Sequence, residues 1–85
     1  MKEVFAMDWR EYIEERPDVM LGKPVIKGTR LTVELILEEL SEGASEADML
    51  EAHPGLRAEH IRAALAFAAA SLSSERTVFA ELQAK

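Results

Sequence analysis

The clearest periodic pattern in the chain lies between residues 33 and 40. Apolar side chains recur there at i, i+3, i+4 and i+7, which is the spacing of one face of an amphipathic helix. The four positions are Val33, Ile36, Leu37 and Leu40. Thr32 has a side chain that can cap the first turn, and Gly43 can adopt the left-handed conformation that ends many helices. The pattern therefore predicts a helix between these two residues.

A second, shorter helix is predicted directly after the first. Ser45 is a good N-cap, and the acidic Glu46 and Asp48 in the first turn are favoured by the helix dipole. The helix must end at or before His53, because the residue before a proline disfavours helical conformation. We expect this helix to bury Ala47 and Leu50.

A longer helix is predicted over residues 58–72. At about 100° per residue, one stripe of side chains forms its expected core face. That stripe consists of Ile61, Ala64, Leu65, Ala68 and Leu72. The opposite side is also apolar, because no charged residue occurs between Arg62 and Glu75.

The apolar residues on that opposite side are Ala63, Ala66, Phe67 and Ala70. A helix that is apolar all round is ordinarily buried on more than one side. We therefore predict that these four residues form an oligomer interface, with a homodimer favoured. The alternative is that the N-terminal helix and the hairpin cover them within one subunit.

The N-terminal part of the chain predicts a short helix and a hairpin. Asp8 and Glu11 have the spacing of a capping box, which predicts a helix over residues 9–15. Residues 19–21 and 24–26 flank a Gly-Lys pair that suits a tight turn between two strands. At the other end of the chain, residues 75–85 fit either a helix or a strand.

These elements together predict a mainly α fold. It consists of a trihelical, helix-turn-helix-like core, a short N-terminal helix and a small β-hairpin. A chain of 85 residues allows one domain, since typical domains have about 100–200 residues. Its expected parts are residues 8–31, which hold the N-terminal helix and hairpin, the core at 32–72 and a C-terminal tail at 73–85.

The amino-acid composition excludes several classes of catalytic and metal site. The chain has no cysteine, which excludes disulfides, thiol nucleophiles and thiolate metal sites. The two histidines, His53 and His60, have no ligand spacing around them, so capping or surface roles are expected. No catalytic, metal or cofactor site is predicted, and an enzyme is the least favoured class. The N-terminus lacks a long apolar run and no stretch is long enough to span a membrane, which predicts a cytoplasmic protein.

Charge is distributed unevenly along a chain of net charge −6. Residues 19–33 contain three cations and no acid, whereas residues 34–53 contain seven acids and no Lys or Arg. Phosphate backbones are bound mainly by Lys and Arg. The candidate DNA contacts are therefore Lys23, Lys27, Arg30, Arg57 and Arg62. The alternatives are that the basic segment is merely solvated, or that Lys27 and Arg30 pair with carboxylates of the following helix.

The segment GKPVIKGTRL at residues 22–31 carries a family resemblance. Together with EGAS at 42–45, HPGL at 53–56 and IRAALAFA at 61–68, it resembles domain of unknown function 433. This family of short prokaryotic proteins is described as VapB-like antitoxins of helix-turn-helix type. Two positions depart from the family pattern. Thr32 stands where the family often has proline, and Arg57 stands where it commonly has Thr or Ser.

The resemblance implies a type II toxin–antitoxin pair in which this chain binds a PIN-type ribonuclease toxin and, as an oligomer, operator DNA. The candidate toxin-binding residues in the tail are Val78, Phe79 and Leu82. The acidic face formed by Glu34, Glu38, Glu42 and their neighbours is a second candidate surface for the toxin. The alternative function is a helix-turn-helix transcriptional regulator without a toxin partner.

Overall fold

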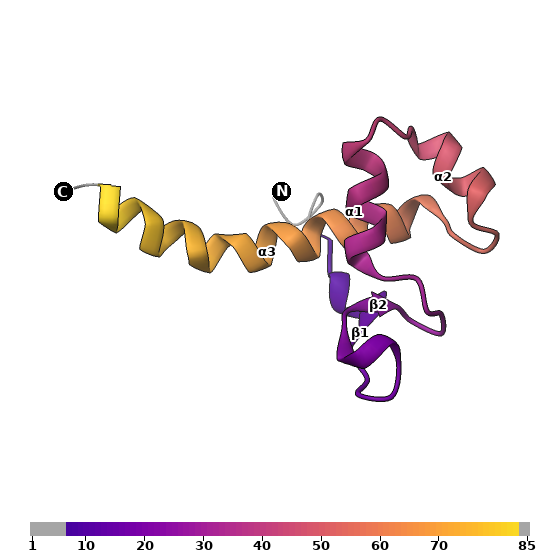
Figure 1. The fold of residues 1–85 in the computed structure, drawn as a ribbon, viewed down its shortest axis with the longest axis horizontal. Coiled ribbons are helices and arrows are strands. Elements are labelled where there is room, and N and C mark those ends of the chain that lie inside the picture. Colours follow the sequence, from indigo (N-terminus) through magenta and orange to yellow (C-terminus); the bar gives the residue numbers. More distant parts are fainter. Residues whose placement is uncertain (1–6, 84–85) are drawn as a thin grey trace.

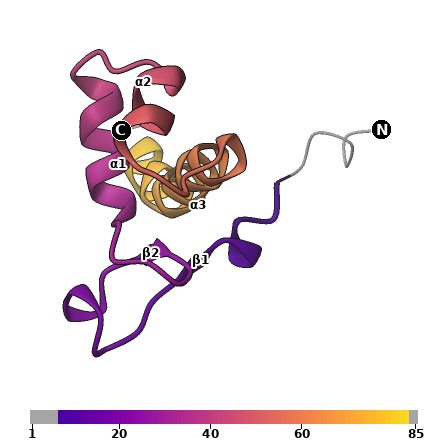
Figure 2. The same cartoon turned by 90° about the vertical axis from the view of Figure 1, so that its right-hand side faces the viewer.

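The computed structural model describes residues 7–83 and the side chains of residues 7–73. Its main elements are β1 (Ile13–Glu14), β2 (Val25–Ile26), α1 (Val33–Ser41), α2 (Glu46–Ala52) and α3 (Ala58–Gln83). The hairpin, α1 and α2 gather around the first part of α3, and the rest of α3 extends away from them (Figure 1). Figure 2, which looks along α3, shows α1 and α2 together on one side of that helix. The predicted mainly helical fold with a small hairpin is confirmed at this level.

The first predicted helix is confirmed as α1. The Thr32 hydroxyl accepts a hydrogen bond from the Leu35 amide at 3.0 Å, as an N-cap does, and Gly43 has a φ of +104° after the last turn. Val33 and Ile36 are fully buried, whereas Leu37 and Leu40 are half-buried. α1 therefore packs more tightly through its first turn than through its second.

The second helix is confirmed, but its buried residue was predicted wrongly. The Ser45 hydroxyl accepts from the Asp48 amide at 3.0 Å, and the Asp48 carboxylate accepts from the Ser45 amide at 2.9 Å. Met49 is buried, whereas Ala47 is exposed and Leu50 is half-buried. A helix of seven residues has too few positions for its stripe to show which side packs inward.

The third helix is longer than predicted and is turned about its axis. Ile61 and Ala64 are buried as expected, but Leu65 and Leu72 are 48% and 57% exposed. Ala63, assigned to the opposite side, is fully buried instead. The buried face is thus rotated by about a quarter turn from the predicted one, at about 100° per residue.

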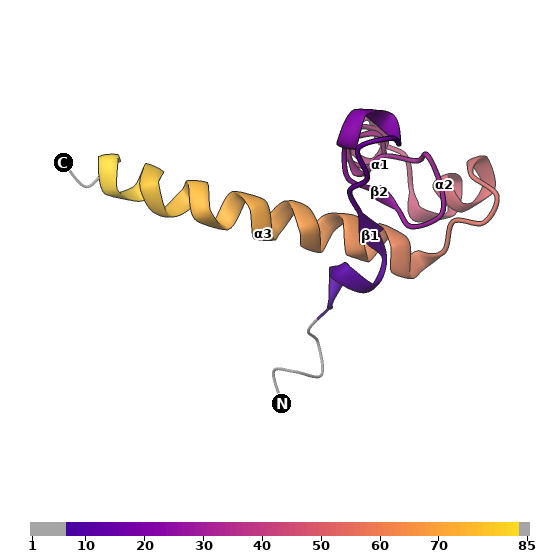
Figure 3. The same ribbon diagram turned by 90° about the horizontal axis from the view of Figure 1, so that it is seen from below.

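The rotation has a visible cause in the N-terminal segment. A 3-10 helix, η2 (Trp9–Glu11), lies against α3, and the rings of Trp9 and Phe67 meet edge to face with centroids 4.8 Å apart. Figure 3 shows this N-terminal segment crossing α3. Contacts within one chain therefore cover part of the side that was predicted to need a partner.

The sequence predicts an N-terminal helix over residues 9–15, but the helix observed there is η2, which has only the three residues Trp9–Glu11. Asp8 caps it as expected, because its carboxylate accepts from the Arg10 amide at 3.2 Å. The helix stops early because Ile13 and Glu14 form a strand instead. A helix in this segment would use the backbone groups that β1 needs for pairing with β2.

The hairpin exists, but its first strand is not the predicted one. β1 and β2 are antiparallel, with Ile13 opposite Ile26 and Glu14 opposite Val25. The segment 19–21, expected to be a strand, contains part of a 3-10 turn, η3 (Met20–Gly22). Met20 and Leu21 there have φ values of 49° and 59°, which are left-handed conformations and incompatible with a strand.

The core lies between the hairpin, the three helices and η2. Its buried apolar residues are Ile13, Val25, Ile26, Val33, Ile36, Met49, Leu56, Ile61, Ala63 and Ala64. Within residues 7–83, none of the helices combines the length and the apolar character that a membrane span requires.

Candidate functional site

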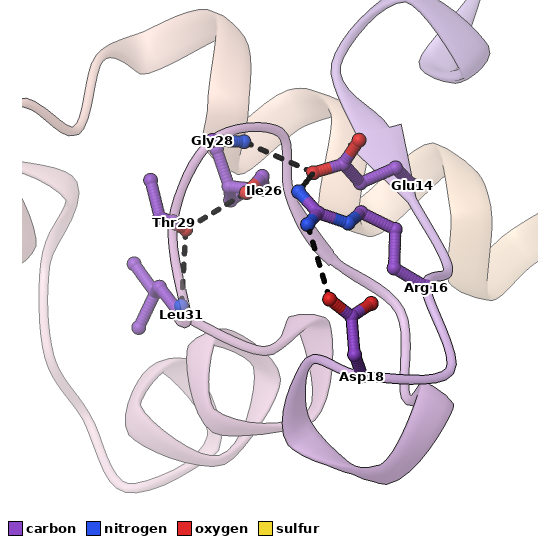
Figure 4. Close-up of polar contacts among 7 residues, drawn as sticks. All are labelled: Glu14, Arg16, Asp18, Ile26, Gly28, Thr29 and Leu31. Carbon is purple, nitrogen blue, oxygen red and sulfur yellow. Dashed lines mark hydrogen bonds and ion pairs between the residues drawn. The ribbon is translucent and has the colours of Figure 1, made fainter.

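The turn between β2 and α1 is held in place by hydrogen bonds to its backbone. Glu14 of β1 accepts a hydrogen bond from the Gly28 amide at 3.1 Å, and Gly28 has a φ of +77°, which favours glycine. The Thr29 hydroxyl donates to the Ile26 carbonyl at 2.8 Å and accepts from the Leu31 amide at 3.0 Å. Figure 4 shows these contacts. The turn therefore has a defined shape.

An ion-pair network supports the same turn from the side of β1. Arg16 lies 3.7 Å from the Glu14 carboxylate and 3.4 Å from that of Asp18 (Figure 4). Arg16 therefore positions the carboxylate that binds the Gly28 amide. Because Arg16 and Asp18 are exposed, the pairs orient side chains more than they stabilise the fold.

The predicted cations fall into two groups. Lys23 pairs with Glu34 of α1 at 3.1 Å, and Arg57 lies 3.9 Å from Glu59. Within the part of the chain whose side chains are described, the side chains of Lys27, Arg30 and Arg62 form no ion pair or hydrogen bond. The alternative that Lys27 and Arg30 pair with the following helix is therefore wrong, since Lys23 makes that contact.

An open cleft of about 420 Å³ lies beside this turn. Apolar side chains from three separate segments form its walls, including Leu31, Leu35 and Leu56. Its polar lining consists of Thr29, Arg30, His53 and His60. The chain has sixteen Asp and Glu residues, but none of those with described side chains lines this cleft.

Both histidines at the cleft have structural partners. His53 Nε2 lies 2.9 Å from the Glu39 carboxylate and so joins the end of α2 to α1. His60 Nδ1 accepts a hydrogen bond from the Arg57 amide at 2.9 Å, which caps the first turn of α3 although Arg57 itself is a poor N-cap. The capping role that the sequence predicted is confirmed for His60. Among residues 7–73, whose side chains are described, no three His, Asp or Glu side chains are arranged to hold a metal ion.

Burial lowers the pKa of His60, the charge of Arg57 lowers it further, and Glu59 partly opposes both. The folded protein therefore binds this proton less well than the unfolded chain, and protonation removes the Nδ1 acceptor. We expect stability to be full above pH 6.5, the ordinary pKa of histidine, and to fall as the pH drops through the lowered value.

Thermal melts of the wild type and of His60→Gln between about pH 5 and 8 check this expectation, because histidine titrates in that range. Glutamine offers an oxygen to the Arg57 amide without titrating. The melting temperature of the variant should vary less with pH than that of the wild type. Equal pH dependence of the two proteins contradicts the role assigned to His60.

The described surface of α3 carries an apolar stripe. Leu65, Ala69 and Leu72 are exposed and follow one another at i, i+4 and i+7, which places them on one face of the helix. Of the predicted interface residues, Ala63 is buried, Ala66 and Phe67 are half-buried and Ala70 is exposed. The predicted toxin-binding residues Val78, Phe79 and Leu82 belong to α3, but their side chains lie outside the described residues.

Sequence reasoning missed the cleft and the Leu65–Leu72 face. The cleft combines residues from β2, the following turn, α1, the end of α2, the α2–α3 connection and α3, so no contiguous motif marks it. The Leu65–Leu72 stripe was visible as a helical pattern but was assigned to the core.

The described residues define a small, mainly helical protein. Its β2–α1 turn, held by hydrogen bonds, places the unpaired side chain of Arg30 beside a cleft that no described Asp or Glu side chain lines. The chain belongs to the family described as "Protein of unknown function (DUF433)", which matches residues 13–68.

Two relatives were found by comparison. "Uncharacterized protein y4eO" of Sinorhizobium fredii is 42% identical over 74 residues, which are 86% of this chain and 34% of that protein. The chain thus spans about a third of the length of this relative. The crystal structure of a DUF433 member protein from Anabaena variabilis superimposes with a TM-score of 0.64 at 26% identity, over 86% of this chain and 68% of the other.

Proposed function

We propose that the chain is the antitoxin of a type II toxin–antitoxin pair, which binds a PIN-type ribonuclease toxin through α3 and operator DNA as an oligomer. The observation that carries the proposal is the extension of α3 beyond the rest of the fold (Figure 1). Residues 69–73 are exposed, and the helix continues to Gln83.

A helix that projects in this way is unusual for a protein that acts alone. Isolated helices shorter than about 12–15 residues are marginal in water, and most helical stability comes from packing of an apolar face. Leu65 and Leu72 offer such a face, yet each is about half exposed. Cover by a second copy of this chain, by the toxin or by both accounts for the length of α3 and for its exposed leucines.

Two surfaces are candidates for the toxin. The first is the extended part of α3, which includes Val78, Phe79 and Leu82, and an apolar helix that docks into a groove is a known recognition mode. The second is the exposed acidic face of α1 around Glu38 and Glu42, whose carboxylates resemble the phosphates that a ribonuclease binds. Glu34 belongs to this face, but its charge is partly balanced by Lys23.

For DNA, we propose that α2 and α3 act as a helix-turn-helix-like unit. Arg57 directly precedes α3 and Arg62 lies in its second turn, and both can contact bases or phosphates in a major groove. Lys27 and Arg30 add two unpaired cations from the turn before α1. The net charge of −6 opposes DNA binding by a single chain, and an oligomer offsets this by presenting two sets of cations to one duplex.

Co-expression with the gene next to its own tests the antitoxin proposal. The tagged chain should co-purify with the product of that gene, and the isolated product should have ribonuclease activity that the chain inhibits. A neighbouring product that neither binds nor has nuclease activity contradicts the proposal.

The unpaired side chains of Lys27 and Arg30 favour a second candidate, a DNA-binding regulator without a toxin. A gel-shift titration with the protein's own promoter at two salt concentrations tests it. Lys27→Ala should weaken binding and reduce the salt slope by about one, because one phosphate contact is lost. Promoter affinity that does not change with Lys27→Ala or with salt contradicts this candidate.

A further inference from the structure

The polar side chains of the cleft differ in whether their hydrogen-bonding groups are already in use. The Thr29 hydroxyl both donates and accepts within its own turn. His53 Nε2 faces Glu39. Thr29 therefore has little left to offer a ligand, and His53 keeps Nδ1, which is an acceptor when the Nε2 hydrogen is donated to Glu39.

Arg30 and His60 are the lining residues whose side chains keep free hydrogen-bond donors. Within the described residues, the Arg30 guanidinium has no partner and so keeps all its N–H donors. His60 Nδ1 accepts the Arg57 amide hydrogen, so the neutral ring carries its own hydrogen on Nε2. Both available side chains are donors, and one of them is a permanent cation.

The lining therefore specifies the charge and shape of what it can bind. A volume of about 420 Å³ lies within the range of about 300–1,000 Å³ typical of small-molecule sites, which are mostly apolar with a few polar groups. A carboxylate matches a guanidinium in bidentate fashion. An ammonium group would meet no acidic side chain among the described lining residues.

We propose that this cleft is a binding site for a small apolar monocarboxylate without an amino group, whose carboxylate pairs with Arg30 and accepts from His60 while its body contacts Leu31, Leu35 and Leu56. This site goes beyond the proposed antitoxin function, because it lies on the β2–α1 turn and the start of α3, not on the extended part of α3. A ligand there would contact the same turn that presents Arg30 to DNA.

The test is a titration of the isotope-labelled full chain with 3-phenylpropionate, followed by amide chemical shifts. We expect saturable shifts of the Leu31, Gly55 and Leu56 amides with one site and a Kd of about 1 mM, as is usual for a ligand of this size. Phenylalanine, which has the same body and an added ammonium group, should bind at least about tenfold more weakly.

Two variants distinguish binding in the cleft from a general effect of positive charge on the affinity for 3-phenylpropionate. Arg30→Ala should weaken 3-phenylpropionate binding by about tenfold, since a charge-assisted contact is lost. Lys27→Ala removes the same charge from the same turn but not from the cleft lining, so its Kd should equal that of the wild type. The two variants also separate this site from DNA binding, which should weaken in both.

Three results overturn the proposal. The first is the absence of saturable shifts at these amides in the wild type. The second is equal weakening by Arg30→Ala and Lys27→Ala, which would indicate a general charge effect. The third is equal affinity for phenylalanine. Spectra of the unliganded variants verify folding, and Arg30→Gln serves as a second removal of the charge.

Discussion

Replacing Ile36 by alanine is expected to lower the free energy of unfolding by about 4 kcal/mol, because a buried Ile→Ala change leaves a cavity and loses transfer free energy. Ile36 is completely buried on α1, within the core that α3 closes. A chain of this length has a total stability of about 4–13 kcal/mol. The change is therefore large enough to leave much of the protein unfolded.

Circular dichroism melts measure this effect. The melting temperature of the variant should fall by about 16–32 °C, since about 1 kcal/mol corresponds to about 4–8 °C in a domain of this size. Leu35→Ala is the matched control, because Leu35 is the neighbouring residue on α1 and is 37% exposed. It should cost less than about 1 kcal/mol. Similar losses in the two variants would mean that the core is not centred on Ile36.

The double variant Leu65→Glu and Leu72→Glu, which places two carboxylates on the exposed stripe of α3, is expected to weaken self-association and toxin binding by about a hundredfold. If this stripe is covered by another chain, each carboxylate becomes buried without a partner. A penalty of about 3 kcal/mol weakens association by about a hundredfold. Sedimentation velocity of the variant and of the wild type measures the change in mass.

The matched control is the double variant Ala70→Glu and Ser71→Glu. Both residues are exposed on the same helix but lie off the Leu65–Leu72 stripe, so the control adds the same charge to a different face. It should associate like the wild type. Loss of association in the control alone would assign the interface to the Ala66–Ala70 side that the sequence predicted.

The helix boundaries that depend on local signals were predictable. Thr32 and Ser45 each accept a hydrogen bond from a backbone amide three residues later, and such caps are visible in the sequence at the right distance from the apolar pattern. Gly43 could be placed for the same reason. These signals act over one or two turns of the chain, which is the range over which sequence patterns are informative.

The features of the fold that the sequence predicts wrongly depend on contacts between residues far apart in the chain. Ile13 pairs with Ile26 across an intervening loop, and no local pattern distinguishes that strand from the first turns of a helix. The orientation of α3 about its axis depends on Trp9, which reaches Phe67 across more than fifty residues of sequence. Without that contact, the leucines of α3 were the natural choice for its core face.

The candidate site was predictable only in part. Arg30 is one of the candidate DNA contacts that the segment 22–31 predicts. Most other residues of this segment have roles in the fold itself. Val25 and Ile26 are buried, and Gly28 and Thr29 shape the turn. Arg30 is the residue of this turn that also lines the cleft as an unpaired charge. The cleft also needs residues from the helices and from the α2–α3 connection, so it could not be read from any one segment.

Amide hydrogen exchange at residues 69–73 tests most directly whether another chain covers α3. These amides should become protected as the protein concentration rises or when the product of the neighbouring gene is added, because cover by a second chain suppresses local opening. Exchange that stays equally fast at all concentrations and with that product present would mean that the extended part of α3 binds neither a second copy of the chain nor the toxin.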